Sequence, residues 1–386
     1  MIAQKYGINL FAQGSDNFCK KQMDALLEHE RWIRMQDDQK DREEAERQER
    51  ADTANEICDY AGEKLQEVAP SVEWDVVAIY DNAGIPSIMH RFKRVTNAEL
   101  FGGSDKVHPA FIIGGEVYDE IYISVYQNMM IDGKPYSLPH AMPETGITME
   151  DFAQACFSKG DGWHCVTAVE WGLLANLSKK MGTLPHGNTA CRAWHGDVNE
   201  KGVPSAEGSG ITLTGTGPVT WTHDHTVTGV HDLCGNILEF CRGCRIAGGK
   251  IEAAENNDAA LPETDLTVNG KGWHPVESND GEQIFASVQG DELFFTTELP
   301  EDGYIGCKWG DVNMTCESEQ MKELALYAGE PDSFCSVDVT DGEYILFRGG
   351  GWSDGASAGL FYSYLDRPRS YVSSLVGGRS AFFRKR

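Results

Sequence analysis

Cysteine and histidine side chains are the first candidates for chemistry in this sequence. Cys241 and Cys244 form a C-x-x-C pair, with Cys234 and His231 a few residues upstream, and zinc accepts such donors. No second cysteine pair follows in the sequence, and a free cysteine is often a small core residue. We therefore expect reduced, mostly buried thiols and no bound metal, with a zinc site as the alternative.

A second group of possible metal donors is His223-Asp224-His225, followed by His231-Asp232. Neighbouring side chains on a strand point to opposite faces, and a loop would need a third ligand. We expect solvated or hydrogen-bonded histidines here. Neither a G-x-S-x-G elbow, a phosphate-binding glycine loop nor an H-E-x-x-H helix occurs in the sequence, so these catalytic motifs give no support to an enzyme.

The segment from Ser353 to Leu375 has an unusual composition. Tyr, Ser, Asp and Arg are crowded together there, and Lys and Glu are absent. Tyr offers a large contact surface at low entropic cost, Ser and Gly offer adaptable hydrogen bonding, and Arg is frequent at binding hot spots. This composition is typical of a binding surface, whereas an accidental solvated strand pair would carry Lys and Glu as well.

Four motifs in the chain resemble one family. Gly229–Phe240 reads G-x-x-D-x-x-G-N-x-x-E-F, and Gly162–Trp171, Phe347–Trp352 and Gly377–Arg379 accompany it. Together they resemble the formylglycine-generating-enzyme family, a variant of the C-type lectin fold, over roughly residues 108 to 384. The resemblance implies that fold, with the Gly229–Phe240 segment acting as scaffold. A bound calcium ion is left open.

Within that family, the spacing from Trp352 through Ser370 is most similar to the variable proteins of diversity-generating retroelements. In those systems a reverse transcriptase mutates template adenines and rewrites the 3′ end of one gene. Changing adenines in AAC or AAT codons yields Tyr, Ser, Asp, Arg, Leu or Gly, but not Lys, Glu, Gln, Met or Trp. The positions that we predict to be variable all fit the reachable types: Gly351, Ser353, Asp354, Ser357, Leu360, Tyr362, Ser363, Tyr364, Asp366, Arg367, Tyr371, Ser373, Ser374, Leu375 and Gly378.

Apolar residues and glycines alternate with these positions, which suggests that display and packing are separated. We expect Tyr362, Tyr364 and Tyr371 to be displayed, so that their joint removal leaves thermal unfolding nearly unchanged. We expect eight scaffold residues: Asp232, Gly235, Asn236, Glu239, Arg348, Trp352, Phe361 and Arg379.

The catalytic branch of the resembled family uses a pair of redox-active cysteines in its C-terminal region to bind copper. No cysteine follows Cys335, so the thiolate ligands for that chemistry are missing. We therefore expect a protein that is not an enzyme and uses no cofactor. A formylglycine-generating-enzyme-like oxidoreductase is the alternative.

Composition restricts the partners. The chain has 386 residues, with 60 acidic against 33 basic side chains and a formal charge of −27, which disfavours nucleic acid and anionic lipid. No secretory signal and no apolar run of about 20 residues is found in the sequence. We expect synthesis in a bacterial cytoplasm and no membrane association.

The predicted elements give an α+β fold. Residues 17–68 are highly charged with a heptad-like seam and predict a long helix, and 71–80 predict a strand. Helices are predicted over 148–157 and 167–180, and strands over 118–126, 218–221, 283–288 and 292–297. We expect an attachment and oligomerisation region over 1–105 and a lectin-like domain over 106–386, with an insertion at about 250–340 and a variable region over 347–384.

The leading hypothesis is a ligand-binding display protein on a bacteriophage virion, similar to a tail-fibre tip that determines host tropism. Its partners would be a protein or glycan receptor on a target cell and, through the N-terminal region, other virion proteins. A homo-oligomer, with a trimer favoured, would raise avidity. A bacterial surface-displayed receptor of the same fold is a further alternative.

Overall fold

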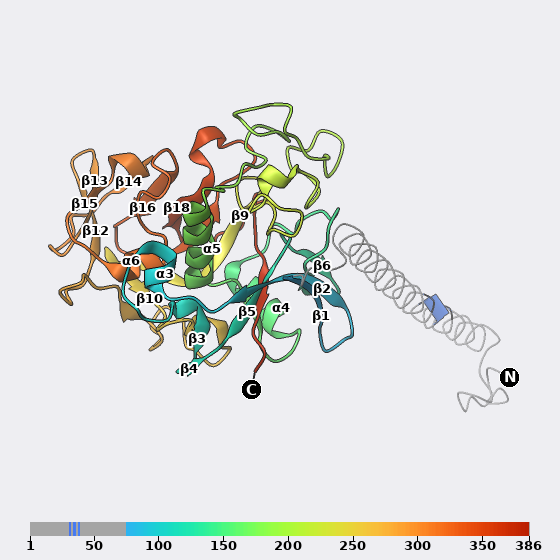
Figure 1. Cartoon of the computed structure of the whole chain (residues 1–386), viewed down its shortest axis with the longest axis horizontal. Coiled ribbons are helices and arrows are strands. Elements are labelled where there is room, and N and C mark those ends of the chain that lie inside the picture. The colour runs from blue at the N-terminus through green and yellow to red at the C-terminus, as the bar shows by residue number, and fades with distance from the viewer. Residues whose placement is uncertain (1–30, 32–33, 36–37, 39–74, 386) are drawn as a thin grey trace, which may run out of the picture. The chain divides into compact units, whose positions relative to one another are not determined.

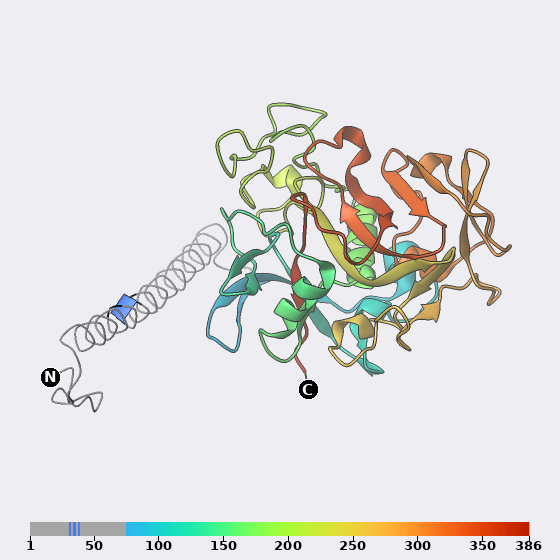
Figure 2. The ribbon, with the colours of Figure 1, turned by 180° about the vertical axis from the view of Figure 1, so that it is seen from behind.

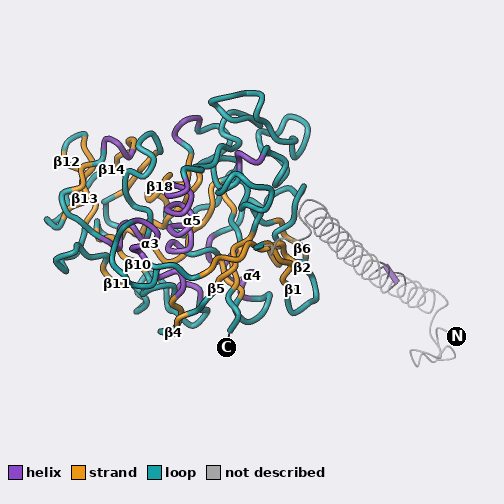
Figure 3. The backbone as a smooth tube through the Cα atoms, viewed as in Figure 1, coloured by secondary structure: helices purple, strands orange, loops and turns teal. Residues whose placement is uncertain are grey.

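The structure is a computed structural model that describes residues 31, 34–35, 38 and 75–385 (Figure 1). Residues 31, 34–35 and 38 are helical, and the rest of the helix and heptad-like seam expected over 17–68 lies outside the described residues. Between 75 and 385 the chain forms many short strands and few helices (Figure 3). The expected α+β class is confirmed at this level.

Five strands from both ends of the described chain form one antiparallel sheet. Their order is β1-β2-β5-β20-β8, with bounds β1 Val76–Tyr80, β2 Pro86–Lys93, β5 Glu120–Ser124, β8 Trp163–Cys165 and β20 Ser380–Phe382. The boundary expected at residue 105 falls between β2 and its hydrogen-bonded neighbour β5. By compactness the chain divides into the units Met1–Thr53 and Ala54–Arg386, and the functional division at residue 105 stays a prediction.

A second sheet of eleven strands contains the C-terminal segment. Its main path is β14-β16-β18-β17-β9-β10-β12-β13-β15, with β11 beside β10 and β19 beside β9. The bounds are β9 Leu238–Ala247, β10 Lys250–Ala253, β11 His274–Pro275, β12 Phe285–Gln289, β13 Glu292–Thr296, β14 Tyr304–Lys308, β15 Asn313–Met314, β16 Phe334–Asp338, β17 Glu343–Gly349, β18 Gly359–Arg367 and β19 Val376–Gly377. The region 250–340, expected as an insertion, is therefore part of this sheet.

Strand β18 lies between parallel β16 and antiparallel β17. Seen from behind, the red C-terminal strands run beside the yellow β9 (Figure 2). The burial pattern of β18 leaves Tyr364 and Arg367 as its two positions that are not buried. A strand covered on both faces has little room for display.

The helices begin and end at residues that the sequence marks. Helix α5 spans Ala168–Met181, with a capping box between Thr167 and Glu170 at its start and Gly182 in a left-handed conformation at its end, as the capping rules predict. The other helices are α3 Asn97–Phe101, α4 Met149–Phe157 and α6 Glu319–Glu323. Both helices expected over 148–157 and 167–180 are confirmed.

The remaining elements are short. They are η1 Pro109–Phe111, β3 Ile112–Ile113, β4 Glu116–Val117, β6 Met129–Ile131, β7 Lys134–Tyr136, η2 Val219–Trp221, η3 Asp258–Ala260, η4 Trp309–Asp311 and η5 Gly355–Ser357. The strand expected over 218–221 is wrong, because this segment forms the 3₁₀ turn η2 with Trp221 fully buried. Among the described residues, no helix is long and apolar enough to cross a membrane.

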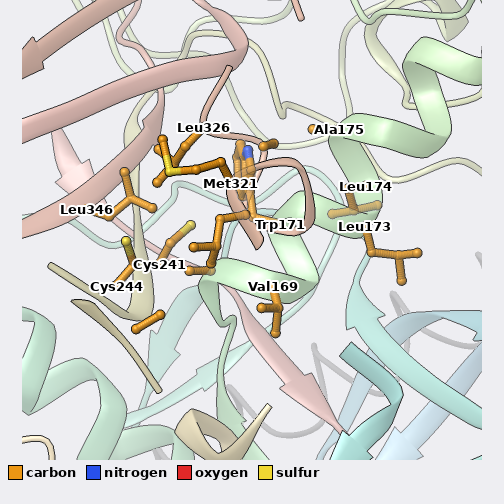
Figure 4. Close-up of a cluster of buried hydrophobic side chains, with 14 of the residues drawn as sticks. Val169, Trp171, Leu173, Leu174, Ala175, Cys241, Cys244, Met321, Leu326 and Leu346 are labelled. Carbon is orange, nitrogen blue, oxygen red and sulfur yellow. The ribbon is translucent and has the colours of Figure 1, made fainter. Parts of the chain in front are cut away.

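Helix α5 packs against the large sheet through a buried apolar cluster (Figure 4). Trp171 is fully buried, and its indole Nε1 donates a hydrogen bond of 2.8 Å to the carbonyl of Leu360 on β18. Gly172 lies so close to α6 that a Cβ atom there would stand 1.8 Å from the carbonyl oxygen of Glu323. These contacts fix α5 against both β18 and α6.

Candidate functional site

The Gly229–Phe240 motif forms a tight loop that joins several long segments. Asp232 and Asn236 have positive φ values of 59° and 65°, which Asp and Asn tolerate better than most residues. The Asn236 side chain accepts from the backbone nitrogen of Thr212 at 2.9 Å and donates to Gln127 Oε1 at 2.8 Å. A Cβ atom at Gly235 would lie 2.1 Å from the carbonyl oxygen of Asn188, so the loop requires glycine there.

A buried ion pair attaches this motif to the C-terminal end of the chain. Arg379 Nε donates to Glu239 Oε2 at 2.6 Å and Arg379 Nη2 to Glu239 Oε1 at 2.5 Å, with both side chains fully buried. Arg379 also donates to the carbonyls of Ser124 and His231, and Gln127 donates to Glu239. The pair is thus bidentate and surrounded by hydrogen bonds, which is what a buried charge needs.

Arg348 holds β18 from the α5 side of the sheet. Its guanidinium is fully buried and donates to Ser363 Oγ at 2.6 Å, to the carbonyls of Phe361 and Tyr362, and to the carbonyls of Leu324 and Ala325. Burial lowers the pKa of Arg348. Arg348 therefore ties the end of α6 to the middle of β18.

The chain turns sharply before it enters β18. Gly349 and Gly350 have φ values of 85° and 77°, and Asp354 Oδ2 accepts a hydrogen bond of 2.8 Å from the backbone nitrogen of Gly351. Burial raises the pKa of Asp354. Of the two aromatic residues expected in the scaffold, Trp352 is half-buried and lies outside the core, whereas Phe361 is fully buried.

Tyrosine rings and one arginine form an aromatic surface at the far end of β18. The Tyr364 ring lies 6.1 Å from that of Tyr362 and 6.2 Å from that of Phe347. The guanidinium carbon of Arg367 stands 5.2 Å from the Tyr364 ring and 5.6 Å from the Tyr371 ring, within the range of cation–π attraction. Arg367 thereby holds the two half-buried tyrosines together.

The structure separates the predicted variable positions by exposure. Nine are exposed or half-buried, and we call them the accessible variable positions: Ser353, Asp354, Ser357, Tyr364, Arg367, Tyr371, Ser373, Ser374 and Leu375. They fall at the two ends of β18, in the 353–357 turn and in the segment 364–375. These are the positions from which side chains can reach a ligand.

The other six positions are buried, so the display expected of them is wrong: Gly351, Leu360, Tyr362, Ser363, Asp366 and Gly378. Leu360 is a core residue, and Ser363 accepts from Arg348. A Cβ atom at Gly378 would approach the Phe152 ring to 2.9 Å. Tyr362 is 6% exposed and packs on Phe334 at 5.6 Å, so its truncation should cost stability, contrary to the expectation for the three tyrosines.

Sequence reasoning missed the residues of 304–334 that support β18. Trp309 Nε1 donates to the carbonyl of Phe361 at 2.7 Å, and Glu330 Oε2 accepts from the backbone nitrogen of Phe361 at 3.1 Å. Phe334 packs against Tyr362 and Tyr364. No spacing in the sequence relates these residues to β18, because the pairing of β16 with β18 joins segments far apart in the chain.

Cys241, Cys244 and His223, which suggested metal chemistry, pack or form hydrogen bonds within the protein, whereas His231 Nδ1 is buried without a hydrogen-bond partner among the described residues. Cys241 and Cys244 lie in the apolar core, and burial raises the pKa of Cys244 to about 12. His223 Nδ1 accepts a hydrogen bond from the backbone nitrogen of Val230. Within the described part of the chain, no three His, Cys, Asp or Glu side chains are grouped as a metal ion would require.

Comparison with known proteins adds two weak structural neighbours. No protein-family model and no curated protein matches the chain. Two solved structures, the Major Tropism Determinant P3c and I1 variants, are similar to 81% of this chain and 73% of their own, with 11% and 12% identity and TM-scores of 0.31 and 0.30. TM-scores of this size do not establish a shared fold, and the formylglycine-generating-enzyme type of C-type lectin fold stays a prediction.

The Arg379–Glu239 pair predicts strong energetic coupling. Arg379→Met or Glu239→Met alone leaves one charge buried without its partner and should lower the free energy of unfolding by about 3 to 5 kcal/mol. The double variant removes both charges and should cost less than the sum of the two. Urea unfolding of the wild type, the two single variants and the double variant measures the coupling energy. If the two losses of stability were strictly additive, Arg379 and Glu239 would not be coupled and the prediction would be wrong.

Acid should destabilise the fold through buried neutral histidines. Burial lowers the pKa of His108 to about 3 and that of His231 to about 4. Burial, together with repulsion from His90, lowers the pKa of His223 to about 3. In the unfolded chain these three histidines bind a proton near pH 6.5, whereas in the folded protein they stay neutral to a lower pH. Their contribution to the free energy of unfolding is therefore complete above pH 6.5 and is lost as the pH falls toward 3.

Between pH 6.5 and its own lowered pKa, each such histidine should lower the free energy of unfolding by about 1.4 kcal/mol for every unit that the pH falls. Burial also raises the pKa of Asp232 to about 6. Protonation of Asp232 between about pH 6 and 4 therefore stabilises the folded state and offsets the loss caused by one histidine. Urea unfolding from pH 7.5 to 4 should therefore show a net fall in stability. His108→Gln should make this fall less steep, whereas replacing the exposed His140 should leave it unchanged. A free energy of unfolding that does not change with pH would refute the role of the buried histidines.

Proposed function

We propose that this chain is a non-enzymatic receptor-binding protein whose accessible variable positions contact a ligand on a target cell. The observation that carries the proposal is the set of accessible Tyr, Ser, Asp and Arg side chains at both ends of β18. These residue types favour binding over turnover. The rigid support from Arg348, Trp309 and Glu330 keeps the cost of ordering the surface low on binding.

Retroelement diversification would account for the residue types at these positions, and for the absence of Lys and Glu between 353 and 375. We further propose that the protein is carried on a bacteriophage virion, through residues N-terminal to the first sheet, as an oligomer that raises avidity. The ligand class, protein or glycan, is open. A receptor on a bacterial surface is the second candidate, supported by the same residues.

An enzyme-like oxidoreductase is the competing hypothesis. It would need thiolates that bind copper, but no cysteine follows Cys335 in the sequence, and burial raises the pKa of the Cys165, Cys234, Cys241 and Cys335 thiols well above the usual range. Neutral buried thiols are poor nucleophiles and poor metal ligands. Copper content and oxygen consumption of the purified protein test this alternative.

Binding should depend on the aromatic surface. The triple variant Tyr364→Ala, Arg367→Ala, Tyr371→Ala removes its accessible part and should reduce binding of labelled protein to a panel of bacterial cells by at least about 100-fold where the wild type binds. Its melting temperature should fall by only a few degrees. Tyr80 is 58% exposed on β1, so Tyr80→Ala is the matched control that should bind normally. Equal binding by the triple variant would refute this surface.

Diversification makes a separate prediction about DNA. The region beside the gene should contain a near-copy of the bases that encode residues 351–378, with adenines at the codons of the accessible variable positions. Sibling genes should then differ at Ser353, Tyr364, Arg367 and Tyr371 but keep Leu360 and Ser363, which packing constrains. Sequencing of the locus and its siblings decides this, and identical codons at the accessible positions would remove the retroelement from the proposal.

A further inference from the structure

A cavity of about 740 Å³ lies near the first turn of α5, at the opposite end of that helix from the turn 353–357. Val169 in the first turn of α5 lines it, whereas Leu184, beyond the last turn, lines a recess together with Ala356 and Ala358 of the variable segment. α5 is 14 residues long, about 20 Å, and the two places lie at its opposite ends. A ligand in this cavity is therefore independent of the β18 surface.

The lining of the cavity is partly apolar and partly acidic. Val107, Pro109, Ile112, Val169 and Leu324 contribute apolar lining. The charged lining consists of four glutamates against one lysine: Glu255, Glu277, Glu319, Glu323 and Lys106. Apolar side chains beside carboxylates that outnumber the one lysine suit a cation carried on an apolar stem.

Two of these glutamates stand one helical turn apart on α6 and share one amide. Asn97 Nδ2 donates to Glu319 Oε1 and to Glu323 Oε1, each at 2.6 Å. Burial raises the pKa of Glu323, and the neighbouring Glu319 adds to the effect. Like charges four residues apart on a helix repel. Glu319 Oε1 also accepts from the backbone nitrogen and Oγ of Ser104, and Lys106 attracts both carboxylates from a longer distance. Among the described residues, neither carboxylate has a lysine or arginine nitrogen within 4 Å.

We propose that this cavity binds a lysine or arginine side chain of a partner polypeptide. The methylene stem lies on Val107, Val169 and Leu324, and the cationic head meets Glu319 and Glu323. Charge complementarity selects this occupant over an apolar or acidic segment. The cavity is a second binding site, with a partner different from the ligand of the β18 surface.

The test uses the full-length protein and three peptides: acetyl-Ala-Lys-Ala-amide, its arginine analogue, and its norleucine analogue, which keeps the stem without the charge. Isothermal titration should show saturable binding of the lysine and arginine peptides, with dissociation constants on the order of 0.1 to 1 mM. The norleucine peptide should bind at least about 10-fold more weakly. Equal binding of the norleucine peptide, or no saturation with any peptide, overturns the proposal.

Matched variants then separate the site from general attraction to an acidic protein. The double variant Glu319→Gln, Glu323→Gln keeps the oxygen acceptors for Asn97 but removes both charges. It should raise the dissociation constant of the lysine peptide about 10-fold. Glu292→Gln removes a charge from a different acidic recess, beside Asp291 and Asp311, and should change nothing. An equal loss in both variants overturns the site. The triple variant of the β18 surface should bind the peptides normally, so failure of the receptor-binding proposal is distinguishable from failure here.

Discussion

The bidentate pair between Arg379 and Glu239 is the interaction on which the rest of the described structure depends. It joins β9 of the large sheet to the residues that precede β20 of the small sheet. Both side chains are fully buried, so the charges gain stability only while each keeps its partner and its surrounding hydrogen bonds. β20 lies between β5 and β8 in the small sheet. The segment 351–378 is therefore held at one end by β17 and at the other end by Arg379 and β20.

Arg348 provides the second fixed point. It is buried and held by carbonyl oxygens and Ser363 Oγ, and no carboxylate between residues 75 and 385 forms an ion pair with it. Arginine suits this place because its five donors have fixed directions and its charge persists under burial. Together, Arg348 and Arg379 hold the strand and the C-terminal end of the variable segment, so that changes in the turns between them need not disturb the sheets.

The sequence predicted well where local rules decide the structure. Thr148, Thr167 and Gly182 mark helix ends through capping, and the alternating patches near 285 and 292 became β12 and β13. It failed where long-range pairing decides. The type of residue at Leu360 or Ser363 fits a displayed position, but only the folded structure shows that Trp171 packs beside Leu360 and that Arg348 binds Ser363. Trp309 and Phe334 were missed for the same reason.

Burial of β18 on both faces restricts where diversity can be tolerated. A side chain inside a packed sheet can change only if its volume and polarity fit fixed neighbours, so substitutions at Leu360, Tyr362 or Ser363 act on stability before they act on binding. Substitutions in the turn 353–357 and in the segment 364–375 meet solvent instead. A binding surface built in this way gains its variety from the two ends of one strand, while the strand itself holds those ends at a constant separation.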